Sequence, residues 1–592
     1  MGDDFQSDQD FALGPEAFPS RRDYELHCLR HSTSHVMAAA VQQIFPDVKF
    51  GIGPPIKNGF YYDMQLPRPL TPEDLEQIEN RMRAISKSGI EFRQETWDKT
   101  KALEFFGSCN QNFKTELIEG IPGDTVSTYQ IGDFTDLCAG PHVRRTSQCK
   151  NFKLTSIAGA YWRGSERNPM LQRIYGTVWP TKDELDEYLK NVEEAKRRDH
   201  RKLGRELELF MMHEWAPGAT FWLPKGTVVY HTLQEKMRRL LSRNGYVEVK
   251  APLLASSDLF KTSGHWTHYK EDMFIVPEEE HEHALKPMNC PEAMLIFGSR
   301  RRSYRELPLR LAEQSVLHRN ERAGVLSGLT RVRQFQQDDS HIFITEEQIG
   351  DEVNRLIGLV DRVYRAFAMP YRFVLSTRNE QKFMGDIALW DKAEAALGKT
   401  LEANNLEYRV EKGDAAFYGP KIDQLVVDSL KREHQLATIQ LDFQQPRNFR
   451  LTYVNEHNSE SIPVVIHRAI YGSYERFIGI LIEHYAGAFP LWLAPVQAKV
   501  MSISEKTVDY AREVYERMVD EDLRVELDVR DDKIGAKIRD AQLEKVPYML
   551  VIGAKEAESR SVAVRSREKG DEGAVSLEDF LARIKTEAAF NY

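Results

Sequence analysis

Apolar residues recur at helical spacing early in the chain. In residues 31–45 they return every three to four positions, from Val36 to Ile44, which predicts a helix with one apolar face. An acidic stretch at 72–87 predicts a second helix. Before them, residues 1–23 are polar and acidic and are interrupted by Gly and Pro, so we expect a disordered tail.

The hydrophobic pattern changes further along the chain. Residues 181–209 carry many charges and few apolar residues, so we expect one long charged linker helix there. From 210 to 493 there are strand-like runs, for example 434–443 and 461–467. Residues 494–592 alternate strand-like and helix-like segments, which predicts a small α/β domain with a mostly parallel sheet. The remaining segment, 24–180, is expected to form a folded unit of its own.

Composition limits the class of protein. The 592 residues suit three or four domains of about 150 residues each. Hydrophobic content is 41%, and no run approaches the roughly 18 apolar residues of a spanning helix, so we expect no membrane segment. The acidic N-terminus lacks an apolar core, so we expect neither a secretory nor a transit signal and infer a cytoplasmic protein.

Cysteine content and charge add two limits. The five cysteines are far apart and form no CxxC pair, which argues against a disulfide framework. A net charge of −10 argues against nonspecific coating of nucleic acid. Local basic segments at 190–205 and 299–305 could still face one RNA, although such charge runs are more often solvated helix faces.

The densest polar segment of the chain is 310–343. Two antiparallel strands joined by the loop 321–331 would bring Arg319 and Arg331 to one face. Paired guanidiniums suit phosphate oxygens, because each planar fork donates two hydrogen bonds and keeps its charge. Taken alone, the segment is equally consistent with a surface hairpin joined by salt bridges. The chain has no GxxxxGK[ST] or GxGxxG element, so a nucleotide would be held by arginines.

Neighbouring segments decide between these interpretations. In order, 245–254, 310–343 and 467–487 resemble motifs 1, 2 and 3 of the class II aminoacyl-tRNA synthetases. Residues 286–294, 334–343 and 464–473 resemble the threonyl-tRNA synthetase family, in a form lacking the N-terminal ubiquitin-like domain. The resemblance runs from about Tyr24 to the C-terminus. It implies an α+β multidomain fold, with an antiparallel-sheet catalytic core, an N-terminal α+β editing domain and a C-terminal α/β anticodon-binding domain.

The resemblance also implies the reaction and its residues. The family activates L-threonine with ATP and transfers it to the 3′ end of tRNA(Thr). In the family, the motif 2 arginine (here Arg319) contacts the α-phosphate and the amino-acid carbonyl, Glu321 reads adenine, and Arg476 holds the γ-phosphate; Mg²⁺ accompanies the ATP. Further positions implied around ATP are Arg331, Gln435 and Thr438, and around threonine and the tRNA end His265, Gln337, Asp339 and Tyr418.

The zinc ligands of the family fall on Cys290, His341 and His467, with one Zn²⁺ per subunit. Separations of 51 and 126 residues would not indicate a metal site by themselves. Three protein ligands leave zinc open positions, which the amino and hydroxyl groups of threonine can fill. Valine lacks the hydroxyl. Serine lacks only a methyl, worth roughly 10–200-fold in discrimination, so a threonine enzyme needs a second check.

The N-terminal unit is expected to be that check. His31 and His35 share one face of a helix because they are four residues apart. With Cys138 and His142 they could form a four-ligand zinc site, and spacing alone leaves this open. Both halves resemble instead the editing domain shared by threonyl- and alanyl-tRNA synthetases, which hydrolyses mischarged seryl-tRNA(Thr), in the threonyl branch largely without a metal. Tyr62, Lys114 and Asp136 match further residues of that pocket.

The last implications concern the tRNA and the assembly. Glu556 and Arg565 match anticodon-reading residues, whereas Asp531 and Ala139 depart from the family pattern, so no contact is assigned to them. Motif 1 implies a homodimer, with tRNA(Thr), L-threonine and ATP as partners. Two alternatives stay open: a synthetase for another amino acid, such as proline or histidine, and a catalytically inactive RNA-binding paralogue. Amino-acid-dependent pyrophosphate exchange separates the three.

Overall fold

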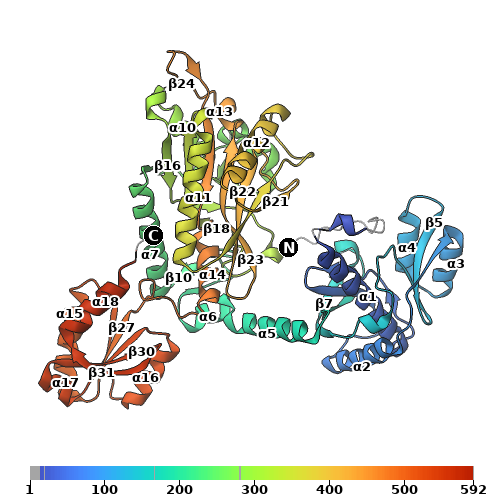
Figure 1. Cartoon of the computed structure of the whole chain (residues 1–592), viewed down its shortest axis with the longest axis horizontal. Coiled ribbons are helices and arrows are strands. Elements are labelled where there is room, and N and C mark those ends of the chain that lie inside the picture. Colours follow the sequence, from blue (N-terminus) through green and yellow to red (C-terminus); the bar gives the residue numbers. More distant parts are fainter. Residues whose placement is uncertain (1–13, 19, 166, 279–281, 591–592) are drawn as a thin grey trace. The chain divides into compact units, whose positions relative to one another are not determined.

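The computed structural model describes residues 14–590 apart from 19, 166 and 279–281, and it divides into two compact units, Met1–Glu193 and Glu194–Tyr592 (Figure 1). The predicted tail at 1–23 falls mostly outside the described residues. Its described end was predicted wrongly, because a short 3-10 helix (Pro15–Ala17) and the start of helix α1 lie there.

Helix α1 (Arg21–Ile44) is the centre of the first unit. It contains the helix predicted at 31–45 but begins ten residues earlier, at a Ser20 side chain that accepts the Asp23 N–H. From Ser32 to Val41 every residue is buried, because the helix is covered on all sides by the sheets and helix α2. The helix predicted at 72–87 is α2 (Pro72–Ser88), which starts at a capping box between Thr71 and Asp74.

Two antiparallel sheets complete the first unit. The larger runs in the order β1-β3-β8-β7, with β2 paired to β3, and the smaller in the order β4-β5-β6. The elements are β1 (Lys49–Phe50), β2 (Pro55–Ile56), β3 (Gly59–Gln65), β4 (Arg93–Asp98), α3 (Lys99–Ser108), α4 (Asn112–Gly120), β5 (Thr125–Ile131), β6 (Phe134–Leu137), β7 (Phe152–Tyr161) and β8 (Met170–Val178).

The linker predicted as one helix at 181–209 is two helices. Helix α5 (Lys182–Arg198) ends before Asp199, and α6 (His200–Glu206) begins after it. Asp199 has an extended backbone with ψ 121°, and its side chain accepts the Arg201 N–H as a helix cap. A carboxylate that can cap a new helix competes with continuation of the old one, and charge periodicity does not reveal this.

An eight-stranded sheet organises the second unit. Its order is β11-β16-β19-β26-β23-β22-β20-β21, and only the two outermost pairings are parallel, which confirms the expected antiparallel core. The strands are β11 (Tyr246–Glu248), β16 (Leu309–Glu313), β19 (Asp339–Ile344), β20 (Tyr371–Ser376), β21 (Tyr408–Glu411), β22 (Lys421–Val427), β23 (Glu433–Asp442) and β26 (Val464–Ala469).

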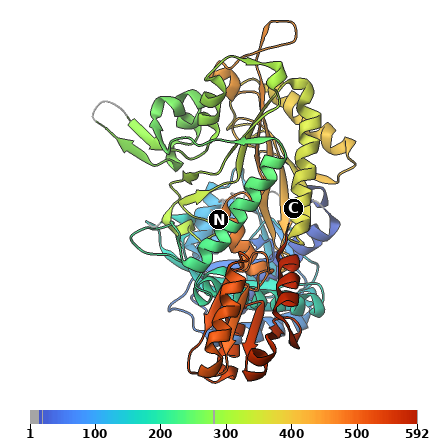
Figure 2. The ribbon, with the colours of Figure 1, turned by 90° about the vertical axis from the view of Figure 1, so that its left-hand side faces the viewer.

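The two faces of this sheet pack against different helices. Ile342 and Ile466 join the core formed with helices α7 (Pro224–Arg243), α11 (Ile349–Ala366), α12 (Ile387–Ala403) and α14 (Tyr474–His484). Phe343 and Val465 face the other way, toward Phe297 of helix α10 (Cys290–Gly298). The long helices α7 and α11 run along the sheet in both views (Figure 1, Figure 2). Because side chains alternate along a strand, His341 and His467 fall on the α10 face.

Shorter elements surround this sheet. A hairpin of β17 (Val316–His318) and β18 (Gln334–Gln336) confirms the pair of strands predicted in the polar segment. The others are β9 (Phe210–Met211), β10 (Phe221–Trp222), β12 (Leu254–Ser256), α8 (Ser257–Ser263), α9 (His265–His268), β13 (Ile275–Pro277), β14 (Glu282–Leu285), β15 (Arg302–Ser303), α13 (Gln445–Asn448), β24 (Tyr453–Val454) and β25 (Glu460–Ser461).

The C-terminal part is a five-stranded sheet, β28-β27-β29-β30-β31, with α15 and α18 on one face and α16 on the other. Its elements are β27 (Ala498–Ser502), α15 (Val508–Val519), β28 (Val525–Asp528), α16 (Ile534–Leu543), β29 (Tyr548–Ile552), α17 (Ala554–Ser559), β30 (Ser561–Ser566), β31 (Gly570–Ser576) and α18 (Leu577–Ala588).

The expectation of a mostly parallel sheet in this part was wrong. Two of the four pairings, β29 with β30 and β30 with β31, are antiparallel. The connections before and after β30 hold eight and three residues. A parallel crossover needs about a dozen or more residues, so these strands can only return antiparallel. Among the described residues, no helix has the length and apolar character needed to cross a membrane.

Candidate functional site

The three predicted metal ligands of the second unit lie together and are buried. Cys290 opens α10, while His341 and His467 are directly opposite each other on the neighbouring strands β19 and β26. One ligand atom from each lies within 4.8 Å of the others. The fold thus joins residues that are 51 and 126 positions apart, because two strands and the start of one helix meet on the same face of the sheet.

The surroundings of this trio favour a metal. Asp442, at the end of β23, lies 2.9 Å from Nε2 of His467 and fixes that ring. A carboxylate behind a histidine is the usual outer partner of a metal ligand. Burial raises the pKa of the Cys290 thiol well above its ordinary value, so the thiol stays neutral unless a cation stabilises the thiolate. Burial also lowers the pKa of His341 to about 4, which keeps its ring neutral and free to ligate.

His265 lies beside the trio, at the start of α9. It is fully buried, its Nδ1 lies 2.8 Å from the Ser263 hydroxyl, and its Nε2 lies 3.7 Å from the Cys290 sulfur and 3.2 Å from Sδ of Met288. Burial, followed by the charge of His467, lowers the pKa of His265 to about 3. A neutral imidazole at neutral pH can accept a proton from a hydroxyl group.

Arg319 follows β17 in the hairpin. Its backbone N–H bonds to the Arg333 carbonyl at 2.8 Å, and its guanidinium lies over the rings of Phe335 and Tyr269, 5.0 and 5.8 Å from their centroids. Nε also donates to the Pro287 carbonyl at 3.4 Å, in the segment that leads to Cys290. Aromatic faces hold the charge in place while leaving most N–H groups available to an anion.

The other two predicted phosphate-binding arginines differ in their surroundings. Arg331 donates through Nε to Glu321 at 2.8 Å, so Glu321 is an ion-pair partner here. Arg476 stands in the first turn of α14, which Ser473 caps. Burial, and then the charge of Arg331, lowers the pKa of Arg476. No carboxylate in the described part of the chain pairs with the Arg476 guanidinium, so this buried site is short of negative charge.

Four further predicted residues line the same region. Asp339 begins β19 and accepts a hydrogen bond from the Asn289 amide at 2.9 Å, and Gln337 pairs with Ser473 across an isolated bridge. The Tyr418 ring stacks on His467, with 4.8 Å between centroids. The Thr438 hydroxyl of β23 is buried and has no hydrogen-bond partner among the described residues, which suits a ligand.

Gln435 stands apart from this group. It lies on the same strand, β23, opposite Leu425 of β22, and its side chain is exposed. No contact with the other predicted ATP-side residues is present among the described residues, so its role stays a prediction.

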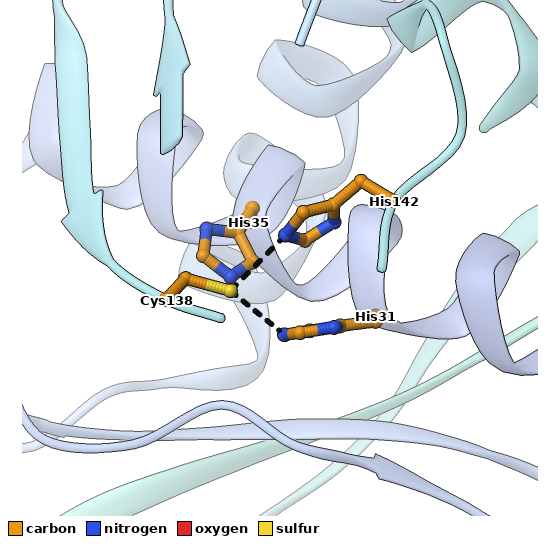
Figure 3. Close-up of side chains that lie close together, drawn as sticks. All are labelled: His31, His35, Cys138 and His142. Atoms are coloured by element: carbon orange, nitrogen blue, oxygen red, sulfur yellow. Dashed lines mark hydrogen bonds between the residues drawn. The ribbon is translucent and has the colours of Figure 1, made fainter. Parts of the chain in front are cut away.

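The four residues predicted to form the editing site of the first unit, called the quartet below, also lie together (Figure 3). His31 and His35 stand on one face of α1, and Cys138 and His142 come from the segment after β6. The Cys138 sulfur lies 3.3 Å from Nε2 of His31 and 3.2 Å from Nε2 of His142. The four ligand atoms lie within 4.8 Å of one another, so the geometry permits a metal and also a hydrogen-bonded cluster.

A buried charge network lies behind His35. Its Nδ1 is 3.4 Å from the Asp136 carboxylate, and Lys114 Nζ lies 2.6 Å from the other oxygen of that carboxylate. Lys114 also donates to the Tyr62 hydroxyl at 3.0 Å, and this hydroxyl donates to Asp136. The structure therefore brings Tyr62, Lys114 and Asp136 together directly behind the quartet.

Burial sets the protonation state of the three histidines in the quartet. It lowers the pKa of His31 and His142 well below the ordinary value, and each neighbouring ring adds to the effect. Burial lowers the pKa of His35 to about 4, against the opposing charge of Asp136. Although burial opposes ionisation of Asp136, Lys114 and His35 together keep its pKa below the ordinary value. Neutral imidazoles beside an ionised carboxylate form a site that can take a proton from water.

The two anticodon-reading candidates lie in the C-terminal part. Glu556 in α17 accepts the Gly553 N–H at 2.9 Å, which completes a helix cap. Arg565 lies on β30, and its Nε is buried without a partner among the described residues. Helix α17 packs on β30. Asp531 lies in the exposed turn between β28 and α16.

Sequence reasoning missed several residues that hold the predicted ones. Asp442 behind His467 and Asn289 beside Asp339 were not predicted, and neither was Ser32, whose hydroxyl lies 3.0 Å from His142 Nδ1. A signal existed for Asp442: in the run 434–443, polar residues alternate with apolar ones inside a strand that is otherwise buried. Such a polar row facing the ligands is typical of a binding face.

Three known protein families match successive parts of the chain. The chain matches the family descriptions "Threonyl and Alanyl tRNA synthetase second additional domain" over residues 126–175, "tRNA synthetase class II core domain (G, H, P, S and T)" over 269–485 and "Anticodon binding domain" over 495–587. It is 52% identical over 556 residues to the threonine–tRNA ligase of Acetivibrio thermocellus, covering 94% of this chain and 87% of that protein.

Further relatives and solved structures are also aminoacyl-tRNA synthetases. The threonine–tRNA ligase of Desulforamulus reducens is 52% identical over 557 residues, covering 94% of this chain and 88% of that protein. Among solved structures, the RNA binding domain of threonyl-tRNA synthetase from Cryptosporidium parvum is 44% identical, with a TM-score of 0.64 over 66% of this chain and 98% of that one. Prolyl-tRNA synthetase from Giardia lamblia, at 17% identity over 67% of this chain and 81% of that one, with a TM-score of 0.52, shares the fold.

Proposed function

The chain belongs to the threonine–tRNA ligase family, and from that membership we propose that it activates L-threonine with ATP and transfers it to the 3′ end of tRNA(Thr). The observation that carries the proposal is the buried group of Cys290, His341 and His467 beside Arg319. A metal-ligand group next to an arginine held on aromatic rings joins amino-acid recognition to phosphate binding in one place.

Amino-acid recognition is assigned to the trio. Cys290, His341 and His467 would hold one Zn²⁺, with the His467 ring oriented by Asp442. Bound there, zinc would act as a Lewis acid with open positions for the amino and hydroxyl groups of threonine. Around it, Asp339 would accept a hydrogen bond from the amino group that zinc holds, because its carboxylate is fixed by the Asn289 amide.

ATP binding is assigned to the arginines. Arg319 and Arg476 would contact the phosphates. This role is supported by the burial of Arg476 near the positive charge of Arg331, where an anion would be stabilised. Glu321 is held by Arg331, which would orient its carboxylate toward the adenine. Preset cations that stabilise the negative charge on the phosphate oxygens are expected to supply most of the rate in such displacements. Mg²⁺ would enter with the ATP.

The first unit is proposed to hydrolyse seryl-tRNA(Thr). His31, His35 and His142 are neutral at physiological pH, and Asp136 is ionised behind them. This set can position and deprotonate a water molecule without a metal. The sulfur–nitrogen distances of 3.2–3.3 Å suit direct hydrogen bonds between these side chains.

Four broader assignments follow from the same family membership. We propose the domain limits 24–180, 181–209, 210–493 and 494–592, because the three family matches fall within the first, third and fourth of these segments. Glu556 and Arg565 are proposed to read the anticodon. A homodimer is proposed from motif 1, and a cytoplasmic location from the five free cysteines, which suit a reducing compartment.

Charging and proofreading can be tested on the same protein. Wild type should load threonine onto tRNA(Thr) and should hydrolyse preformed seryl-tRNA(Thr). A His31→Ala, His35→Ala double variant should charge threonine normally but lose the hydrolysis and accumulate seryl-tRNA. Cys149→Ala, which changes a buried residue of the same unit outside the quartet, is the control for loss of fold. Equal hydrolysis by wild type and the double variant would remove the first unit from proofreading.

A further inference from the structure

His200, the first residue of α6, is buried between two of the segments assigned to ATP. Its side chain lies 2.6 Å from Glu483 through Nδ1, and its Nε2 lies 3.0 Å from the backbone nitrogen of Leu329. An amide N–H can only donate, so Nε2 is the acceptor and Nδ1 carries the proton that Glu483 accepts. The ring is therefore a neutral imidazole with both nitrogens used.

Two glycines make room for this ring. At Gly328, which has φ +47°, an added Cβ would stand 2.2 Å from His200 Nε2. At Gly479, on α14, an added Cβ would stand 3.2 Å from the Leu329 side chain and 3.6 Å from the imidazole. Contacts below 3.0 Å force a shift, so the notch occupied by the ring exists only because residue 328 has no side chain.

On one side, His200 holds the turn from which Arg331 projects. Ser327 and Arg331 exchange backbone hydrogen bonds of 3.1 and 3.3 Å, which close a tight turn with Leu329 at its tip. The Leu329 side chain is fully buried, and its N–H is satisfied by His200 alone among the described residues. Arg331 leaves the end of this turn to reach Glu321 at 2.8 Å.

On the other side, His200 holds the helix that carries Arg476. Glu483 stands on α14 seven residues after Arg476, two turns along the same face. The same Glu483 oxygen also accepts the His200 backbone N–H at 3.0 Å. Its other oxygen is bonded to Arg432, which is paired with Asp428 at 2.6 Å. The carboxylate is thus fixed and can serve as an anchor.

The group of Asp199, His200 and Glu483 is better explained as a hydrogen-bonded cluster than as a metal site. Asp199, His200 and Glu483 offer ligand atoms within 4.8 Å of one another. However, the Asp199 carboxylate is bonded to the Arg201 guanidinium at 2.5 Å and caps α6. Both nitrogens of His200 are engaged as well. The Asp199 carboxylate and both His200 nitrogens already make hydrogen bonds within the protein, so they are poorly suited to bind a metal ion.

We infer that His200 is a positioning residue for ATP: it fixes the turn that presents Arg331 against the helix that presents Arg476. This inference rests on the proposed function, because it needs ATP to bind at Arg476 and at the Glu321 carboxylate that Arg331 holds. The link is made by a residue of the linker segment, so the ATP site depends on a side chain outside the three synthetase motifs.

Four variants and one control test it. His200→Ala removes both contacts. Gly328→Ala leaves the histidine in the chain but pushes its ring out of the notch. His200→Gln can place a carbonyl oxygen near the position of Nε2, which restores an acceptor for the Leu329 N–H. Glu483→Gln keeps an acceptor for His200 but weakens the bond to Arg432. Arg198→Ala is the control, because Arg198 fixes the same linker to His484 and Ser429 without touching the turn.

The measurement is threonine-dependent pyrophosphate exchange in full-length protein, with active sites counted by titration. We expect His200→Ala and Gly328→Ala to lower kcat/KM for ATP about 10-fold or more, because a buried N–H loses its acceptor. The KM for threonine should change less than about twofold. His200→Gln should recover part of the loss, and Arg198→Ala should match wild type.

Each outcome decides the question. Unchanged kcat/KM for ATP in both His200→Ala and Gly328→Ala overturns the inference, and so does an equal loss in Arg198→Ala, which would indicate a general structural role. If His200→Ala does not fold, Gly328→Ala and His200→Gln give the answer. If wild type itself exchanges no pyrophosphate with threonine, the proposed function fails before His200 is at issue.

Discussion

Replacing Lys114 by Met tests the buried charge network behind the editing quartet. The Lys114 and Asp136 side chains are 4% and 3% exposed, and their charged atoms lie 2.6 Å apart. Methionine keeps most of the volume and removes the charge and the hydrogen bonds to Asp136 and Tyr62. The substitution leaves the Asp136 carboxylate buried, with the Tyr62 hydroxyl and His35 as its remaining partners among the described side chains.

The size of the effect follows from that burial. Removing one partner of a buried ion pair costs about 3–5 kcal/mol, because the remaining charge has lost its compensation. Asp136→Asn should cost a similar amount, since it leaves the Lys114 ammonium buried. The double variant removes both charges, so it should be less destabilised than the sum of the single variants by at least about 2 kcal/mol.

Two assays on the full chain measure this. Hydrogen exchange of α1 amides gives the local free energy of unfolding for each variant, and hydrolysis of preformed seryl-tRNA(Thr) gives the functional effect. Ser88→Ala, at the exposed end of α2 in the same unit, is the control. A coupling energy below about 0.5 kcal/mol would show that Lys114 and Asp136 act independently and would refute the reasoning.

Metal analysis of the wild type should find about one zinc per chain, and Cys290→Ala should abolish both this zinc and threonine activation. The melting temperature of the variant should stay near that of the zinc-free wild type. Normal activation by a metal-free variant contradicts the zinc assignment. Arg319→Ala and Arg476→Ala should each cost at least about 2–3 kcal/mol in pyrophosphate exchange, and near wild-type rates would disprove the assignment at that position. Because the pKa of His35 is about 4 in the fold and 6.5 unfolded, the unfolded state binds more protons between these values. The free energy of unfolding near α1 should therefore fall as pH drops from about 6.5 to 4, by up to about 3 kcal/mol from this residue, and His35→Gln should remove that share.

Local chemistry made part of the fold predictable. The α2 helix was located from its acidic stretch, and the structure shows that Pro72 stands in its first turn and Gly89 at its C-terminal end. The start of α1 was missed, because residues 21–30 are mostly polar or charged and are covered by tertiary contacts that a local pattern does not record. The break at Asp199 was missed for a similar reason, since one side-chain hydrogen bond decides it.

The candidate site depended on resemblance more than on pattern. Nothing local connects Cys290 with His341 and His467, because the strand register that brings them together is a property of the whole sheet. The hairpin around Arg319 was predictable from its own residues. The partners that hold the site were less accessible: the polar row of 434–443 indicates a binding face but not which residue Asp442 contacts, and the charged segment around His200 suggests only a solvated helix.

Pyrophosphate exchange by the wild-type protein, measured with each standard amino acid in turn, tests whether the chain selects threonine. We predict fast exchange with threonine, because its hydroxyl can complete the coordination of zinc at Cys290, His341 and His467. We predict slower exchange with serine, by roughly 10–200-fold in kcat/KM, and none above background with valine. Exchange driven best by another amino acid, or by none, would contradict this prediction.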